Sequence, residues 1–79
     1  MTYTYEWEGA PYDVSQEQLI VRRLHSDGML EGSRRVGFVT HKLIPNMYEA
    51  RTTKSRDIQM FRSKKDAKAW VLAMVRLTN

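Results

Sequence analysis

Aromatic and polar residues alternate through the first eight positions of the chain. Tyr3, Tyr5 and Trp7 fall on one side of this pattern, and threonines and glutamates fall on the other. A period of two residues is typical of a β-strand with one buried face. The sequence therefore predicts a strand over residues 2–8, closed by turn-forming residues at positions 9–11. Such aromatic side chains can stack on nucleic-acid bases, but a short chain needs large apolar groups inside, so we expect them to face the core.

Residues 15–26 allow two interpretations. Ser15 and Gln18 have the spacing of a capping box, and the apolar residues behind them would give a helix one buried side. Two adjacent β-branched residues favour instead a strand over residues 18–24. We expect the helix and keep the strand as the alternative.

Three segments in the middle of the chain have the pattern of strands. They cover residues 34–43, 47–53 and 58–62, and turn-forming residues at 44–46 and 54–57 separate them. Because short connections usually join neighbouring strands, we expect a hairpin of the first two, with the third strand beside the second.

The C-terminal segment has helical periodicity. Ser63 and Asp66 form an S-x-x-D cap at its start. Behind this cap, apolar residues recur at the spacing of one helix face: Ala67, Trp70, Val71, Met74 and Leu77. The sequence as a whole predicts an α+β fold of order β-α-β-β-β-α. In this fold an antiparallel meander sheet of three to four strands carries two helices on one face.

Length and composition narrow the class of protein. A chain of 79 residues buries one modest core, so we expect residues 1–79 to form a single domain. The absence of cysteine excludes a disulfide framework and a cysteine-rich zinc site. The N-terminus lacks the pattern of a signal peptide, and the longest apolar run is far too short to cross a membrane. We expect a soluble, cytoplasmic protein that does not bind membranes.

The residues that usually carry catalysis form no recognisable set. The two histidines, His25 and His41, are sixteen positions apart and fit neither a catalytic signature nor a zinc site. The glycines do not form a phosphate-binding loop. We therefore expect a binding protein without cofactor or metal, and not an enzyme.

Positive charge is concentrated in the second part of the chain. Residues 1–31 carry six acidic and two basic side chains, whereas residues 32–79 carry three acidic and eleven basic ones. Such asymmetry indicates association with anionic partners, although a charged surface can also serve solubility alone. The candidate binding residues flank the predicted strand ends and the start of the last helix: Arg34, Arg35, Arg51, Lys54, Arg56, Arg62, Lys64, Lys65 and Lys68.

The segment over residues 62–68, which reads RSKKDAK, resembles the start of the last helix in double-stranded RNA-binding domains. That family has the order α-β-β-β-α, and its helix-start lysines contact phosphates across the major groove. The resemblance implies this role for Lys64, Lys65 and Lys68. It ends where Trp70 replaces a small residue of the family pattern.

In size, lack of cysteine and uneven charge, the chain is also similar to anti-CRISPR proteins and other phage inhibitors of host machinery. These proteins share no motif, so the similarity implies a mode of action and no site residues. The first of three hypotheses is thus an inhibitor from a phage or mobile element. It would dock through a basic surface on a host nucleic-acid-handling complex, such as a CRISPR effector. The second is a domain that binds duplex nucleic acid through its phosphates. The third is a structural module, as a monomer or as a homodimer through the edge of the N-terminal strand.

Overall fold

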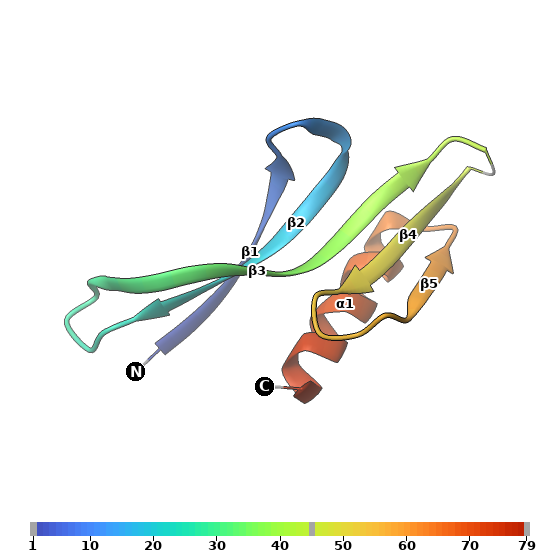
Figure 1. Ribbon diagram of the computed structural model, residues 1–79. Helices are drawn as coiled ribbons and strands as arrows, with labels where there is room; N and C mark the ends of the chain where they lie inside the picture. The colour runs from blue at the N-terminus through green and yellow to red at the C-terminus, as the bar shows by residue number, and fades with distance from the viewer. Residues whose placement is uncertain (1, 45, 79) are drawn as a thin grey trace.

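The computed structural model describes residues 2–44 and 46–78. Five antiparallel strands follow one another along the chain and form a single sheet, in which each strand pairs with the next. One helix follows the last strand in the described part of the chain (Figure 1). The elements are β1 (Thr2–Ala10), β2 (Asp13–Leu24), β3 (Leu30–Lys42), β4 (Met47–Thr52), β5 (Ile58–Phe61) and α1 (Lys64–Thr78).

The predicted order β-α-β-β-β-α, with two helices and three to four strands, is wrong. Most of residues 15–26, predicted as a helix, belong to β2, which pairs with β1 on one side and β3 on the other. The α-β-β-β-α order implied by the resemblance is absent for the same reason. The alternative interpretation, a strand over residues 18–24, was correct.

The middle of β2 was predicted as a helix because both faces of this strand are buried. Leu19 and Val21 enter the core beneath the helix, while Ile20 faces the other way and is still only 9% exposed. A strand buried on both faces shows a continuous apolar run instead of an alternation. Periodicity alone does not distinguish such a run from a buried helix segment.

The other elements were predicted correctly, with shifted ends. β3 begins at Leu30, four residues before the predicted start, and β4 and β5 pair beside it as expected. Pro45, in the predicted turn between β3 and β4, lies outside the described residues. The hydroxyl of Ser63 accepts a hydrogen bond from the backbone N–H of Asp66 at 3.4 Å, as the predicted cap requires.

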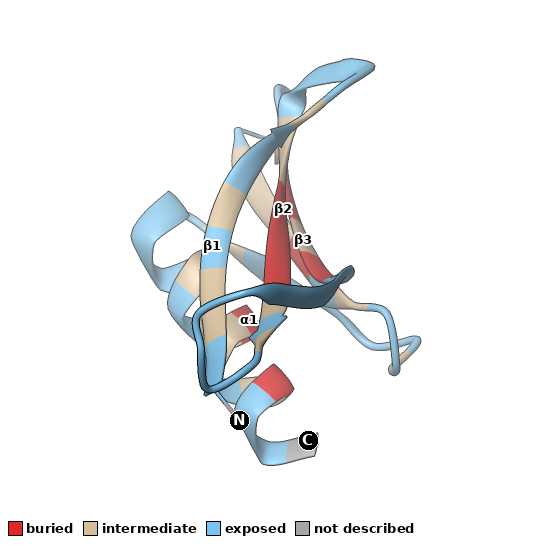
Figure 2. Ribbon diagram, turned by 90° about the vertical axis from the view of Figure 1, so that its left-hand side faces the viewer, coloured by how far each residue is buried: buried red, intermediate tan, exposed pale blue. Residues whose placement is uncertain are grey.

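Helix α1 covers one face of β3, β4 and β5. We call this face of the sheet the helix side and the opposite face the open face. Small and β-branched residues four apart on the helix pack onto the sheet, which brings the two layers close together. The core consists of Leu19, Val21, Val36, Val39, Ala50, Ala67, Val71 and Val75. Figure 2 shows the buried residues in the middle of β2 and β3 and on the inner side of α1.

A β-bulge divides β3 into two parts. The register between β2 and β3 shifts at this point, so that Leu19 lies opposite Gly37 but Ile20 lies opposite Arg35. The residue between them, Val36, is buried in the core. A bulge increases the local twist of a strand. Beyond it the hairpin of β2 and β3 projects away from α1 (Figure 1). We call this projecting hairpin, together with the start of β1, the arm.

Candidate functional site

The nine basic residues predicted as a binding site do not form one surface. Strand register and contacts divide them into a group at the helix start, a group on the open face, and Arg34 on the helix side of the arm. Lys54 and Arg62 are exposed in the connections on either side of β5.

The helix-start group is largely bound within the chain. Lys68 donates a hydrogen bond to the carboxylate of Glu17 on β2 at 2.8 Å, and Lys64 forms an ion pair with the same carboxylate. The ammonium of Lys68 also lies 5.1 Å from the centroid of the Trp7 ring on β1. These contacts tie the first turn of α1 to β1 and β2. Of the three lysines that the resemblance singled out, only Lys65 has no acidic partner among the described residues.

The two lysines determine the ionisation of Glu17. Partial burial raises the pKa of the Glu17 carboxyl, but the hydrogen bonds and charges of Lys64 and Lys68 outweigh burial. The pKa therefore lies below its ordinary value of 4.5. The same contact raises the pKa of the Lys64 ammonium.

Removal of this carboxylate should destabilise the fold in a pH-dependent way. We expect Glu17→Gln to lower the free energy of unfolding by roughly 1 kcal/mol at neutral pH, because the pairs are partly exposed. Folding lowers the pKa of Glu17. The stabilisation is therefore complete when the pH is well above 4.5, and it is lost as the pH falls through the lowered pKa. Urea unfolding of both proteins over a pH series should show the difference shrinking in acid. A difference that is constant with pH would contradict this role.

The open face carries a row of side chains across four strands. In the register of the sheet, Gln18 on β2 lies opposite Phe38 on β3, which lies opposite Arg51 on β4, which lies opposite Ile58 on β5. The guanidinium carbon of Arg51 is 5.0 Å from the centroid of the Phe38 ring. This cation–π contact holds the exposed guanidinium near the centre of the face. Arg35 lies on the same face, because its partner Ile20 is two residues from Gln18.

The loop between β4 and β5 adds Arg56 to this surface. Arg56 lines a hollow of about 360 Å³ together with Phe38, Arg51 and Ile58. Hydroxyl-bearing side chains of the loop, among them Ser55, line the same hollow. The loop is shaped locally, since the hydroxyl of Ser55 accepts a hydrogen bond from the backbone N–H of Asp57 at 3.0 Å. We call Arg35, Phe38, Arg51 and Arg56 the arginine cluster.

The arginine cluster has no acidic counterpart in the described ranges 2–44 and 46–78. None of Arg35, Arg51 and Arg56 has a carboxylate within 4.0 Å there. Lys42, also on the open face, does have an acidic neighbour, since Glu49 lies 3.7 Å from its ammonium. The arginine cluster therefore offers three positive charges without a described acidic partner.

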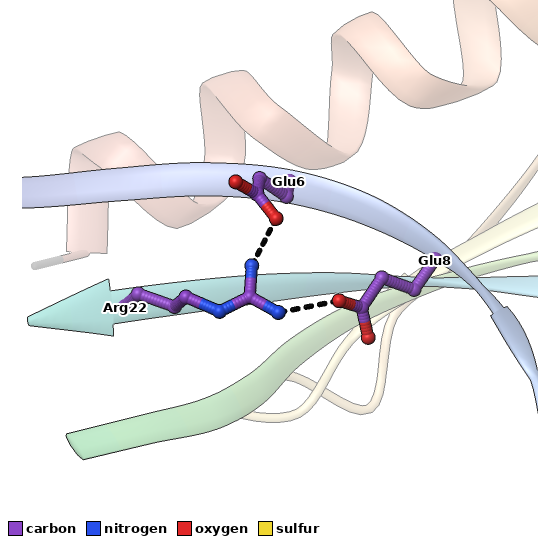
Figure 3. A network of polar contacts seen from close by, with 3 residues as sticks. All are labelled: Glu6, Glu8 and Arg22. Carbon is purple, nitrogen blue, oxygen red and sulfur yellow. Dashed lines mark hydrogen bonds and ion pairs between the residues drawn. The ribbon is translucent and has the colours of Figure 1, made fainter. Parts of the chain in front are cut away.

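Arg22, also on the open face, differs from the arginines of the cluster because it has acidic partners. Its guanidinium donates hydrogen bonds to the carboxylates of Glu6 and Glu8 on β1 (Figure 3). The hydrogen bond to Glu8 and the charges of both carboxylates raise the pKa of Arg22 further. These three side chains carry a net charge of −1, so this end of the open face does not attract anions.

A second concave surface lies on the helix side of the arm. Tyr3, Tyr5, Val21, Arg23 and Arg34 line it, with a volume of about 620 Å³. Arg23 pairs with Glu31 at 3.1 Å. The prediction that the N-terminal aromatics face the core is confirmed for Tyr5 and Trp7, which pack against it. It is wrong for Tyr3, which is 55% exposed because α1 does not reach the arm.

The histidines make local contacts only. The His41 ring stacks on Tyr48 with a centroid distance of 4.6 Å and forms a hydrogen bond with Asn46. His25 lies 3.9 Å from Glu31. Among the described residues, no group of three or more histidine, cysteine, aspartate or glutamate side chains is placed to hold a metal ion.

The central residue missed by the sequence is Phe38. Simple alternation along β3 puts Arg35 and Phe38, three residues apart, on opposite faces. The bulge at Val36 reverses the alternation and brings both to the open face. Gly37, an isolated glycine inside the strand pattern next to Val36, is the one local signal that could have indicated a bulge at this point.

Comparison with known proteins adds no further guide to function. In the part of the chain that the structure describes, no helix is both long enough and apolar enough to span a membrane. The chain matches no protein family, no curated protein and no solved structure.

Proposed function

We propose that this protein binds double-stranded nucleic acid through its phosphates, with the arginine cluster as the contact surface. The observation that carries the proposal is the position of Arg51. It lies over Phe38 on the open face, with Arg56 lining the same hollow, Arg35 on the same face of the sheet, and no carboxylate of the described residues within 4.0 Å of these arginines.

The chemistry of the cluster suits a phosphate backbone. Arginine presents several N–H donors in a fixed plane and binds phosphate oxygens with two of them. Serine and threonine hydroxyls, such as that of Ser55 in the hollow, are common further donors to phosphates. None of these contacts reads a base, so we expect binding with little dependence on sequence.

The dimensions of the surface also suit a duplex. Strands in a sheet are about 4.8 Å apart, so the backbones of β3, β4 and β5 together span about 10 Å. The major groove of B-DNA is about 12 Å wide and admits a β-ribbon. Arg35 on β3, Arg51 on β4 and Arg56 in the loop before β5 lie at different positions across this surface, so they can contact different phosphates of one duplex.

The inhibitor hypothesis, which the sequence alone placed first, stays a prediction and here ranks second. A protein partner would have to offer several unpaired carboxylates at matching positions, whereas every duplex offers phosphates along its whole length. Capture of a discrete host protein complex by this chain, with no affinity for nucleic acid, would reverse the ranking.

Neighbouring arginines on β3 provide a matched test of the proposal. Arg35 lies on the open face, and Arg34 lies on the helix side with Tyr5 and Val21. We expect Arg35→Ala to weaken binding to a labelled random-sequence duplex about tenfold and to reduce the salt slope by about one. Arg34→Ala removes the same charge from the next residue and should change both values far less. Fluorescence anisotropy with duplex DNA and duplex RNA measures the effects, and equal losses in the two variants would argue against the open face.

A further inference from the structure

Strand β1 forms a long edge of the sheet. It has nine residues, from Thr2 to Ala10, and pairs only with β2. The opposite edge, β5, has four residues. The outer side of an edge strand presents unpaired backbone N–H and C=O groups, to which a further strand can bind.

The usual protection of an edge is missing along most of β1. Natural edges carry proline, charged side chains (lysine above all) or a bulge that prevents pairing. The two charged residues of this edge, Glu6 and Glu8, are bound by Arg22 of the neighbouring strand β2. Residues 2–8 contain neither proline nor lysine, and the only register irregularity between β1 and β2 lies at Gly9 and Ala10. Near the N-terminal end of this edge, the aromatic side chain of Tyr3 is 55% exposed on the helix side of the arm.

We infer that β1 pairs with β1 of a second copy, as an antiparallel two-fold dimer centred on Tyr5. In such a dimer each contact occurs twice, because both subunits use the same surface. With Tyr5 at the axis, Tyr3 lies opposite Trp7 of the second copy, which places aromatic residues together on the helix side. On the open face, Thr4 lies opposite Glu6 of the second copy, and Thr2 lies opposite Glu8. This inference does not rest on the proposed binding of nucleic acid.

The charges of β1 select this register over its neighbours. A centre at Glu6 puts the two Glu6 carboxylates directly opposite each other, and like charges at such positions are destabilising. A centre at Thr4 leaves only residues 2–6 of each strand paired. The register centred on Tyr5 pairs residues 2–8 and opposes no two like charges. It therefore combines a long pairing with cross-strand neighbours that attract each other.

Charge changes at Thr4 test the dimer. Sedimentation equilibrium of the full chain should show reversible dimerisation that depends on concentration. Thr4→Glu places a carboxylate opposite Glu6 of the second copy twice in the dimer, so we expect dimerisation roughly tenfold weaker. Thr4→Lys at the same position should not weaken it. Within one subunit Thr4 lies opposite Arg22, so the effects on monomer stability have the reverse sign and can be separated by thermal unfolding at low concentration.

The absence of cysteine allows a direct test of the register. Tyr5→Cys should form a disulfide between subunits under mild oxidation, because the two copies of this residue meet at the axis. Thr2→Cys, whose two copies lie far apart in the same register, should not. A wild-type chain that stays monomeric at millimolar concentration would overturn the dimer. Equal dimerisation of the two Thr4 variants, or cross-linking of Thr2→Cys in preference to Tyr5→Cys, would overturn this register.

Discussion

Gly37→Ala is expected to lower the free energy of unfolding by about 3 kcal/mol. A Cβ at this position would lie 2.3 Å from Cγ1 of Val71 on α1, well inside van der Waals contact. Val71 is fully buried, and the carbonyl oxygen of Arg51 would lie 3.4 Å from the added carbon. The helix therefore has to move away from β3 to make room. For a domain of this size, such a loss is a large part of the total stability.

Three further variants, Gly32→Ala, Val71→Ala and the double variant Gly37→Ala with Val71→Ala, show whether the close approach is the cause. Gly32→Ala adds the same methyl group where nothing lies within 4 Å, so its stability should change by less than about 0.5 kcal/mol. In the double variant Gly37→Ala with Val71→Ala, the clashing methyl group is gone. Its loss of stability should be smaller than the sum of the two single losses. Urea unfolding of the wild type, the three single variants and the double variant measures these differences, and equal effects of Gly37→Ala and Gly32→Ala would contradict the packing.

Removal of all three arginines of the cluster should nearly abolish binding to duplexes. We expect the variant with Arg35, Arg51 and Arg56 changed to alanine to bind about a thousandfold more weakly, since each charged contact contributes about a factor of ten. All three residues are exposed, so the fold should remain intact. Circular dichroism and the unfolding midpoint establish that the variant is folded before its affinity is measured by anisotropy.

A second triple variant separates the site from the net charge. Arg34, Lys65 and Arg76 are also exposed, but Arg34 lies on the helix side of the sheet and the other two lie on α1, so none of them is on the open face. Their change to alanine removes the same three positive charges. If binding depends on the cluster, this control variant should lose far less affinity. Similar losses in both triple variants would show that only the total charge matters.

Local sequence patterns predicted most elements correctly, but they did not show that residues of β2 form a strand and not a helix. The C-terminal helix shows both a cap at Ser63 and a regular apolar spacing, and each signal is local. The helix predicted around Ser15 had similar local signals. In the structure Ser15 instead donates a backbone hydrogen bond to the side chain of Asp13 at 2.9 Å. Burial on both faces of β2 depends on β1, β3 and α1 together, and no local pattern carries that information.

The candidate site shows the same limit. The sequence predicted Arg35, Arg51 and Arg56 as binding residues, and all three belong to the proposed arginine cluster. It did not separate them from Lys64 and Lys68, which both pair with the single carboxylate of Glu17. The hydrogen bond of Lys68 joins residues 51 positions apart, and such a contact depends on the complete fold.

The salt dependence of duplex binding tests the proposed function most directly. If the three arginines of the cluster each neutralise one phosphate, a plot of log affinity against log salt concentration should have a slope of about −2.7 for duplex DNA. The slope should fall towards zero when Arg35, Arg51 and Arg56 are replaced by alanine, and it should change little in the control triple variant. A wild-type protein that does not bind duplex DNA or RNA at low salt, or a slope unchanged by removal of the cluster, would contradict the assignment.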